Sequence, residues 1–512
     1  MIAKNNLIKI SDYLWEIPKT FRSDMRVPAR IYASEKMLES VFKDKSLEQL
    51  VNLTTLPGIE KYALVMPDVH EGYGSPIGGV FATRASDPLR QGSSEASGII
   101  SPGAVGYDIN CGVRLLKSDV SADEIKNRLD DLATEIQRNV PSGLGRGRKI
   151  KLSVNELDKI LENGAQELIK QGYGKKEDME NCEANGRLEW ADANEVSDTA
   201  KNRGRDQVGT LGSGNHFLEI QKVEEIFDEN AAKIFGLFKN QAVVMIHTGS
   251  RGLGHQIATD YIRLMLQVMP KYNIHLPDKE LACAPFNSPE GQKFFKAMAC
   301  GANFAWANRQ MITHYIRESW KKVFLNENNE NLEVLYDVAH NIAKLEDGLL
   351  VHRKGATRAF PPSAGRSEPT ARQSPPSAGR SEPTARQSPP SHPEIPKKYK
   401  EIGQPVIIPG SMGTASYILH GTEKGKEAFY SSCHGAGRTM SRHQALKTLK
   451  GQEIIKNLEN KNIIVKCYSM RGIAEEAPQA YKDIDEVVEI VHQANLSKKV
   501  ARLVPLAVIK GE

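Results

Sequence analysis

Two residues with metal-binding side chains, Asp108 and Cys111, lie three positions apart between glycines in the segment Gly106–Arg114. In a tight turn this spacing can direct a carboxylate and a thiolate at one point. Together they suit a borderline transition metal such as Mn, Zn or Co, rather than Mg²⁺ alone. An isolated copy of the pattern is more simply explained as an Asx turn followed by a buried cysteine. The interpretation therefore depends on what the rest of the chain can bring to this turn.

Five histidines occur in glycine-rich segments elsewhere in the chain, most of them at or just after a short apolar run. One histidine in such a position is more often a satisfied core group than a metal ligand. Five of them beside one Asp-x-x-Cys turn favour a metal centre. One carboxylate, one thiolate and three imidazoles could hold two metals if the thiolate bridges them, and a pair about 3.5–4 Å apart suits phosphoryl transfer. The polar loop residues are Asp68, His70, Asp108, Cys111, Asn215, His216, Glu219, His247, His340 and His434.

Four glycine-rich loops lie among these residues. Each loop alone predicts a tight turn, and none matches the pattern G-x-x-x-x-G-K-[ST] or a dinucleotide fingerprint. Together with neighbouring hydroxyl and guanidinium groups they could present N–H groups to phosphates. The loops are 209–214, 249–254, 410–413 and 435–437, and the side chains are Ser411, Ser416 and Arg438.

His434 stands between Cys433 and the sequence Gly-Ala-Gly. An imidazole can act as a covalent nucleophile when a carboxylate orients its other nitrogen. Such a histidine could attack a nucleotide α-phosphate. A further metal ligand or a turn histidine would have the same local sequence, so the residues alone leave the three alternatives open.

Short apolar runs precede most of these loops and predict the strands that position them. A strand followed by a polar loop recurs along the chain, which would collect the loops at one end of a sheet system. The predicted strands include 62–66, ending before a loop at 67–74, and 242–247, 334–338 and 406–408. Helices are predicted at 33–50, 121–137, 153–172 and 297–323, with an exposed, charged helical region at 175–207.

Composition places the chain among soluble globular proteins. It has 512 residues, of which 40% are hydrophobic and 26% charged, and a net charge of +5. The mild basicity permits a polyanionic partner without requiring one. Six scattered cysteines without C-x-x-C spacing are not a disulfide framework and fit a reducing cytosol. The chain has no signal-peptide pattern and no run of apolar residues that would span a membrane, so a cytoplasmic location is expected.

A 14-residue segment, Pro361–Ser374, is repeated without change as Pro375–Ser388. Proline, serine, arginine and glutamate dominate it, and aromatic residues are absent. Such a segment cannot bury apolar surface and should be disordered or a flexible surface loop. We interpret 361–390 as a low-complexity insertion in an otherwise single catalytic domain that spans 1–512. A polar, small-residue segment at 85–98 is expected to be a surface excursion.

Eight longer motifs follow one another along nearly the whole chain: Asp68–Gly74, Gly106–Arg114, Gly212–Glu219, His247–Gly252, Asp337–Asn341, His352–Arg358, Pro409–Ser416 and His434–Arg438. In sequence and order they resemble the motifs of the RtcB RNA-splicing ligases. The resemblance implies that family's own α+β fold, with mixed sheets, surrounding helices and active-site loops gathered at one end. The doubled repeat is not part of the family pattern.

The resemblance also implies a GTP- and Mn²⁺-dependent ligase. It would join RNA ending in a 2′,3′-cyclic phosphate or 3′-phosphate to RNA with a 5′-hydroxyl, in tRNA splicing or RNA repair. In such enzymes a histidine takes GMP from GTP, the GMP passes to the RNA 3′-phosphate as an activated 3′-pp-G end, and the 5′-hydroxyl displaces it. A 3′-phosphate has no good leaving group, and guanylylation supplies one.

The resemblance assigns roles by position. His434 would be the guanylylated histidine, and Asp68 the carboxylate that orients it. Two Mn²⁺ per active site would be bound by Asp108, Cys111, His216, His247 and His340, with Cys111 bridging. The implied GTP pocket consists of Asn215, Phe217, Leu218, Glu219, Asn341, Pro409, Gly410, Ser411, Met412, Ser416, Gly435, Ala436, Gly437, Tyr481 and Lys510, with Lys510 reading the guanine edge.

The implied partner is RNA, as tRNA halves or broken RNA, and archease assists some members of the family. The protein is expected to be a monomer or a weak oligomer. Two other classes of function compete with the ligase. A dinuclear metal phosphohydrolase would need only Cys111 and the histidines, whereas His434, the glycine loops and Lys510 would have no use in it. The third class, a non-catalytic RNA-binding protein, is permitted by the basicity but leaves the metal-ligand set unexplained.

Overall fold

The computed structural model describes residues 2–85, 98–142, 151–324, 331–363 and 395–511. Most of the segment predicted to be a surface excursion, and nearly all of the doubled repeat, lie outside these residues. Within them, mixed sheets and surrounding helices form the α+β fold that was expected. No helix among the described residues is long and apolar enough to cross a bilayer.

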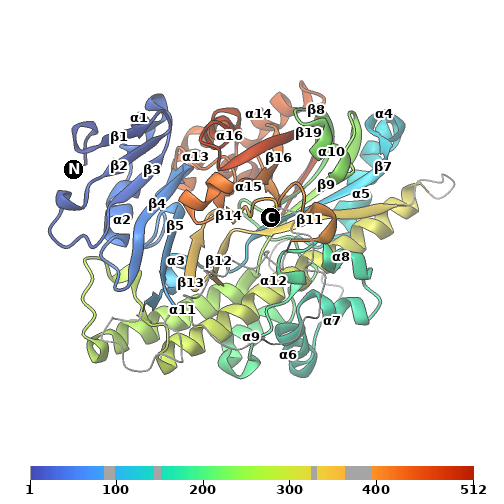
Figure 1. Ribbon diagram of the computed structural model, residues 1–512. Helices are drawn as coiled ribbons and strands as arrows, with labels where there is room; N and C mark the ends of the chain where they lie inside the picture. The colour runs from blue at the N-terminus through green and yellow to red at the C-terminus, as the bar shows by residue number, and fades with distance from the viewer. Residues whose placement is uncertain (1, 86–97, 143–150, 325–330, 364–394, 512) are drawn as a thin grey trace, which may run out of the picture.

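A seven-stranded sheet carries Asp68. Its strand order is β1-β2-β3-β4-β5-β13-β12, in which β3 and β4 run parallel and the other neighbouring pairs antiparallel. In Figure 1 its first strands form the blue sheet at the left. The strands are β1 (Ile8–Ser11), β2 (Leu14–Ile17), β3 (Ala29–Tyr32), β4 (Ile59–His70), β5 (Ile77–Arg84), β12 (Asn341–Glu346) and β13 (Leu349–Lys354).

An eight-stranded sheet carries the candidate metal ligands. Seven of its strands follow the order β11-β7-β9-β8-β19-β16-β15, and β18 pairs with β19 in parallel. The strands are β7 (Gly112–Ser121), β8 (Phe217–Ile226), β9 (Gln241–Thr248), β11 (Leu332–Ala339), β15 (Pro405–Ile408), β16 (Ser416–Gly421), β18 (Ile464–Lys466) and β19 (Ser497–Lys510). Two short ladders complete the described sheets, β6 (Ile99–Ile100) with β10 (Ala284–Pro285) and β14 (Ala356–Arg358) with β17 (Ser431–Cys433).

The longest helix, α12 (Pro289–Val323), runs across the lower part of the molecule beside α11 (Arg251–Val268) (Figure 1). Ser288 caps it by accepting a hydrogen bond from the Gly291 N–H, and Pro289 occupies the first helical position, where its missing N–H costs nothing. Most of α12 is buried, including Trp306 and Trp320. Residues 297–313 are buried on every side of the helix, which makes α12 a central support of the fold.

The other helices surround the sheets. They are α1 (Glu35–Val41), α2 (Ser46–Leu53), α3 (Pro102–Val105), α4 (Ala122–Ile125), α5 (Leu129–Asn139), α6 (Val154–Asn163), α7 (Ala165–Lys170), α8 (Lys176–Glu180), α9 (Asp198–Gly204), α10 (Glu229–Phe235), α13 (Arg442–Thr448), α14 (Gly451–Glu459), α15 (Met470–Glu475) and α16 (Ile484–Gln493).

Several predicted helices are interrupted. The predicted helix 153–172 is broken at Gly164, which has φ +60° and lies where a Cβ would be 2.2 Å from the Gly186 carbonyl oxygen. Close approach of another segment therefore imposes the break. The predicted helix 33–50 is two helices, α1 and α2, and 121–137 is divided between α4 and α5 by a 3₁₀ turn. Region 175–207 is largely turns and short 3₁₀ segments around α8 and α9, rather than a continuous helical region.

The predicted strands at 242–247, 334–338 and 406–408 are confirmed within β9, β11 and β15. The strand predicted at 62–66 is longer than expected, because β4 continues to His70. The pairing of β4 with β5 shifts register between Val65 and His70, which accommodates Pro67 and its missing N–H. Asp68 therefore projects from an irregular strand, and not from the loop predicted at 67–74.

Candidate active site

The turn at Asp108–Cys111 brings a carboxylate and a thiol to a group of imidazoles. Cys111 Sγ lies 3.3 Å from His247 Nε2 and 3.6 Å from His216 Nε2. His216 Nε2 is 2.9 Å from Asp108 Oδ2, and His247 Nε2 is 3.2 Å from His340 Nε2. The ligand atoms form two groups that share Cys111: one with His247 and His340, the other with Asp108 and His216. All five residues assigned as metal ligands are thus in one cluster.

Strand register explains why these residues meet. Strands β11, β7, β9 and β8 are consecutive neighbours in the eight-stranded sheet. Cys111 immediately precedes β7, His216 precedes β8 and His340 follows β11, while His247 is the next-to-last residue of β9. The pairs Ala339↔Gly112, Val113↔His247 and Phe217↔His247 place all four positions at the same end of the sheet. Residues far apart in sequence therefore converge through ordinary antiparallel pairing.

The donor set fits a transition-metal cation. Burial lowers the pKa of His247 and of His340 well below its usual value, so both imidazoles are neutral and offer lone pairs. Burial, and then the Asp108 carboxylate, raise the pKa of the Cys111 thiol well above its usual range. A metal would therefore displace a proton from Cys111 on binding. Sulfur, nitrogen and oxygen donors in one buried cluster are the set that suits a borderline metal.

His434 is held by Asp68 beside this cluster. Asp68 Oδ2 accepts hydrogen bonds from the His434 backbone N–H at 2.9 Å and from His434 Nδ1 at 2.6 Å. Asp68 is fully buried. A proton held on Nδ1 by the carboxylate leaves a lone pair on Nε2, which is the condition for a nucleophilic imidazole. The His434 ring is 5.1 Å from the His340 ring, so the nucleophile candidate adjoins the metal cluster.

The chain folds this way locally because the segment after His434 lies against β4. Gly437 has φ +73°, and a Cβ there would be 2.1 Å from the Asp68 carbonyl oxygen. No larger residue fits at this distance. The loop Gly435–Gly437 can therefore lie directly on the Asp68 backbone, and the Gly435 N–H adds a third hydrogen bond to Asp68 Oδ2 at 3.3 Å.

A cavity of about 860 Å³ opens over His434 and the metal cluster. That volume is in the range of nucleotide and cofactor sites. Sixteen of the residues assigned to the site line it: Cys111, Asn215, Phe217, His247, His340, Asn341, Pro409, Gly410, Ser411, Met412, His434, Gly435, Ala436, Gly437, Tyr481 and Lys510.

The remaining assigned residues lie behind the cavity wall. Asp68, Asp108 and His216 reach the site through the contacts given above. Glu219 Oε2 accepts a hydrogen bond from Gln221, whose amide also donates to Ser416 Oγ, and Ser416 Oγ accepts from the Gly410 N–H at 3.1 Å. Leu218 is fully buried in the apolar core. Glu219 and Ser416 thus form a layer that supports the glycine loop at 410–413.

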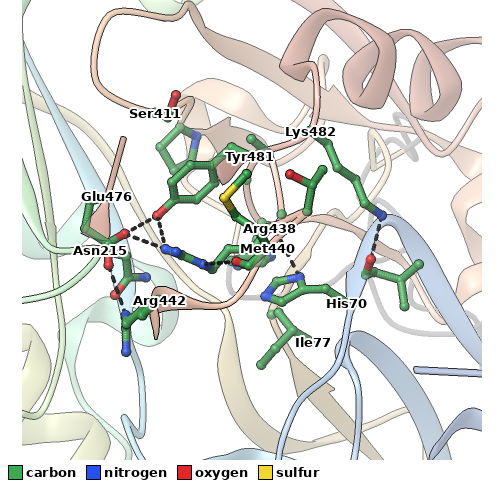
Figure 2. Close-up of a pocket in the computed structure, with 18 of the residues that line it drawn as sticks. His70, Ile77, Asn215, Ser411, Arg438, Met440, Arg442, Glu476, Tyr481 and Lys482 are labelled. Atoms are coloured by element: carbon green, nitrogen blue, oxygen red, sulfur yellow. Dashed lines mark hydrogen bonds and ion pairs between the residues drawn. The ribbon is translucent and has the colours of Figure 1, made fainter. Parts of the chain in front are cut away.

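A charged network also lines the cavity (Figure 2). Glu476 accepts hydrogen bonds at 3.0 Å from both Arg438 and Arg442, and Tyr481 donates its hydroxyl proton to the same carboxylate. The Arg438 guanidinium lies 5.0 Å from the centre of the Tyr481 ring. Lys510 Nζ, near this network, donates to the Gly214 carbonyl oxygen at 2.6 Å. Arginine and lysine side chains beside an aromatic ring can bind a phosphorylated, aromatic ligand.

Several residues that line the cavity were not identified from sequence as site residues, among them the charged residues Arg442, Glu476 and Lys482. Lys482 Nζ is 2.9 Å from the Pro67 carbonyl oxygen and 2.5 Å from that of Val69, so it holds the backbone on both sides of Asp68. Its position directly after Tyr481, which had been assigned to the GTP pocket, was the sequence feature that could have identified it as a site residue. Glu476 follows another glutamate, and nothing in the sequence distinguishes the two.

Comparison with known proteins identifies the family. The family model described as tRNA-splicing ligase RtcB matches residues 49–376 and 384–511. The chain belongs to the tRNA-splicing ligase RtcB family. It is therefore an RNA ligase. The break in the match, 377–383, falls within the second copy of the repeat.

Relatives named tRNA-splicing ligase RtcB cover almost the whole chain. The protein of Aeropyrum pernix is 49% identical over 98% of this chain and 99% of its own length. That of Nanoarchaeum equitans is 51% identical over 99% of each chain. An RNA-splicing ligase RtcB of Mycobacterium bovis is 46% identical over 90% of this chain and all of its own length.

Proposed function

We propose that this RtcB-family ligase uses GTP and Mn²⁺ to join RNA 2′,3′-cyclic phosphate or 3′-phosphate ends to 5′-hydroxyl ends, in tRNA splicing or RNA repair. The proposal includes a histidine–GMP intermediate on His434 and an activated RNA 3′-pp-G end. The observation that carries it is the 2.6 Å contact between Asp68 and His434 Nδ1 beside the Cys111 cluster. A nucleophile held by a carboxylate, next to a metal-ligand set and inside one cavity, is the combination that nucleotidyl transfer requires.

In the first step, His434 Nε2 attacks the α-phosphorus of GTP. A P–N bond forms, the P–O bond to the β-phosphate breaks, and pyrophosphate leaves with the electron pair. The positive charge that develops on the imidazole is stabilised by the Asp68 carboxylate, which accepts the hydrogen bond from the Nδ1–H of His434. Because Asp68 is fully buried, its charge acts on the imidazole with little screening by water.

In the later steps the GMP passes from His434 to an oxygen of the RNA 3′-phosphate, and the P–N bond breaks. The 5′-hydroxyl of the second strand then attacks the same 3′-phosphorus and displaces GMP, which leaves a phosphodiester. A cyclic phosphate is first opened by water to the 3′-phosphate. This order overcomes the lack of a leaving group on a phosphate monoester.

The metal-ligand cluster supports two cation sites that share the thiolate. Cys111 with His247 and His340 would hold one Mn²⁺, and Cys111 with Asp108 and His216 the other. When bound, the cations would offset the negative charge of the phosphoryl groups in transfer. His216 Nδ1 donates to the Leu211 carbonyl oxygen at 3.1 Å, which fixes Nε2 as the ligating nitrogen.

Other residues that line the cavity support the assignment of the nucleotide site. The glycine loops at 410–413 and 435–437 present backbone N–H groups, and Tyr481 offers an aromatic face. Lys510 is the residue that we assign to the guanine edge. Burial lowers its pKa, and the charge of Glu476 opposes this effect.

A labelling experiment tests the proposal. The protein is incubated with GTP labelled at the α-phosphate and with Mn²⁺, and acid-labile label on the protein is measured. Wild type should be labelled, His434→Ala should not, and His492→Ala, a matched change on α16, should label as wild type does. An unlabelled wild type, or equal labelling of His434→Ala, would contradict the histidine–GMP step.

The dinuclear phosphohydrolase is the remaining alternative. It would need the metal cluster and a water molecule, but no carboxylate that positions His434. Release of inorganic phosphate from 3′-phosphorylated RNA with GTP absent would favour it. The ligase proposal instead expects no release of inorganic phosphate from the RNA. With GTP and Mn²⁺ the 3′-phosphate should be capped by GMP, and it should become a phosphodiester only when a 5′-hydroxyl strand is also present.

A further inference from the structure

Two adjacent polar residues, Asn308 and Arg309, lie in the middle of the buried helix α12. Both side chains are fully buried. Neither belongs to the metal-ligand groups or to the residues that line the cavity. A buried arginine is costly unless its donors are satisfied, so the groups that accept its hydrogen bonds indicate what it holds in place.

Arg309 contacts three segments that carry ligands. Its Nη1 donates to the Asn110 carbonyl oxygen at 3.0 Å, inside the Asp108–Cys111 turn, and to the Thr248 carbonyl oxygen at 2.8 Å, next to His247. Its Nη2 donates to Asn110 Oδ1 at 3.1 Å. The guanidinium also binds both carboxylate oxygens of Asp337, three residues before His340, at 2.8–3.2 Å.

Asn308 contacts the remaining ligand segment. Its Oδ1 accepts from the Thr210 N–H at 2.9 Å, and its Nδ2 donates to the Thr210 carbonyl oxygen at 3.1 Å. The next residue, Leu211, supplies the carbonyl oxygen that accepts from His216 Nδ1. Asn308 Nδ2 also lies 3.2 Å from the Gly249 carbonyl oxygen, which ties this segment to the one that follows His247.

One turn of α12 therefore touches every segment that carries one of the five proposed ligands. Asn110, inside the turn, has a φ of +52°. Its side-chain amide donates to the Ala302 carbonyl oxygen, which is also on α12. A positive φ in a residue other than glycine persists where the surroundings fix it. The contacts thus hold the Asp108–Cys111 turn in the conformation that directs both side chains inward.

A simpler explanation of Asn308 and Arg309 is that they only satisfy the hydrogen bonds of buried backbone groups. The helix itself contains the comparison that separates the two explanations. Asn303 is also fully buried and bonded to backbone groups: it accepts from the Leu188 N–H at 2.7 Å and donates to the Leu161 and Leu188 carbonyl oxygens. These partners lie outside the ligand segments, so Asn303 satisfies backbone groups without holding a ligand.

We propose that Asn308 and Arg309 are positioning residues that hold the four ligand-bearing segments in a metal-ready arrangement. This inference rests on the proposed metal site. It assigns to α12 the support that ligating groups usually receive from hydrogen bonds outside the coordination sphere.

The test measures equilibrium binding of Mn²⁺ to full-length, nucleotide-free protein, by the electron paramagnetic resonance signal of the free ion. Asn308→Ala is compared with Asn303→Ala, and thermal unfolding is followed for each in the presence of a chelator. Each alanine should lower the unfolding temperature. Of the two variants, we expect only Asn308→Ala to weaken Mn²⁺ binding, by about 10- to 100-fold.

Arg309→Lys provides a second variant if Asn308→Ala does not fold. A lysine keeps the positive charge but lacks the planar fork that spans Asn110, Thr248 and Asp337, so Mn²⁺ binding should again weaken. Mn²⁺ affinities of Asn308→Ala and Arg309→Lys that match wild type would overturn the inference, as would an equal loss in Asn303→Ala. A wild-type protein that binds no Mn²⁺ would overturn the metal proposal itself, and this inference with it.

Discussion

The wall of the cavity that carries Cys111 and the wall that carries Glu476 hold their functional groups by different means. On the first wall, four of the five ligands lie at or beside the end of a strand, and neighbouring strands fix the spacing of the four segments. The side chains are short, and the turn of α12 at Asn308 and Arg309 contacts their backbone from behind. The backbone therefore determines the geometry of this wall.

The second wall is built from long side chains that bind one another. Arg438, Arg442 and Tyr481 meet at the Glu476 carboxylate, and they come from a loop, the start of α13 and the segment between α15 and α16 (Figure 2). The Arg442 side chain is 53% exposed, whereas that of Glu476 is 2% exposed. An exposed ion pair contributes little because of solvent screening and lost side-chain freedom. Arg442 can therefore rearrange around a ligand at small cost, whereas the Arg438–Glu476 pair is largely buried.

The difference suggests which wall is ready before substrate arrives. Ordering long side chains costs free energy, whereas ligands on paired strands are already ordered. We expect single substitutions on the first wall to have large effects that are confined to metal binding. Substitutions on the second wall should have smaller effects, confined to the nucleotide.

The largest effect is expected at Asp68, which orients His434 beside the first wall. Asn in place of Asp68 can donate to Nδ1, which favours the tautomer with a proton on Nε2 and blocks the nucleophile. Labelling by GTP should slow by on the order of 10³- to 10⁴-fold. Equilibrium Mn²⁺ binding should be unchanged. Labelling at the wild-type rate would show that Asp68 does not orient His434.

Cys111→Ser should have the next largest effect. A serine hydroxyl stays protonated and binds Mn²⁺ weakly, and Cys111 belongs to both ligand groups. Mn²⁺ affinity should fall by at least about 100-fold. GTP binding measured with a chelator present should not change. If GTP binding falls as much as Mn²⁺ binding, the two walls are not independent and the comparison fails.

Tyr481→Phe should have a smaller effect, of less than about tenfold, on GTP affinity. The ring remains, while the hydroxyl that donates to Glu476 is lost. Arg438 and Arg442 still hold the carboxylate, so the network can adjust. Titration of GTP into the variant measures this change. A loss as large as that predicted for Cys111→Ser would show that the second wall is as rigid as the first.

The first wall could be predicted largely from sequence, and the second only in part. Asp108 and Cys111 carry their chemistry in their residue types. The apolar runs that lead to His247 and His340 predicted strands that the structure confirms within β9 and β11. The ligands then converge through regular antiparallel pairing of these strands. Family resemblance supplied the roles, including that of His434, which the residues alone left open.

Long-range burial could not be predicted. Glu476 is a buried anchor on which Arg438, Arg442 and Tyr481 converge, and its neighbour Glu475 shows the same residue type without that role. Asn308 and Arg309 lie within a helical pattern that gives no sign of which strand ends they face. Gly164 interrupts a predicted helix because a distant glycine approaches it. Each of these features depends on contacts between segments far apart in sequence.

The smallest effect is expected from replacing residues 364–390 with a short Gly/Ser linker. The described residues on either side already meet: the Ser363 N–H donates to the Lys400 carbonyl oxygen at 2.8 Å, and the Gln404 N–H donates to that of Phe360 at 2.9 Å. The contacts given above for both walls are made by residues outside this segment. Closing a shorter loop between ends that already meet changes the free energy of unfolding by only about 0.6 kcal/mol per halving of its length.

Labelling rate, Mn²⁺ affinity and GTP affinity should therefore equal those of wild type. A large change in GTP affinity alone would assign the repeat to the second wall, and would show that this wall depends on more than the Glu476 network.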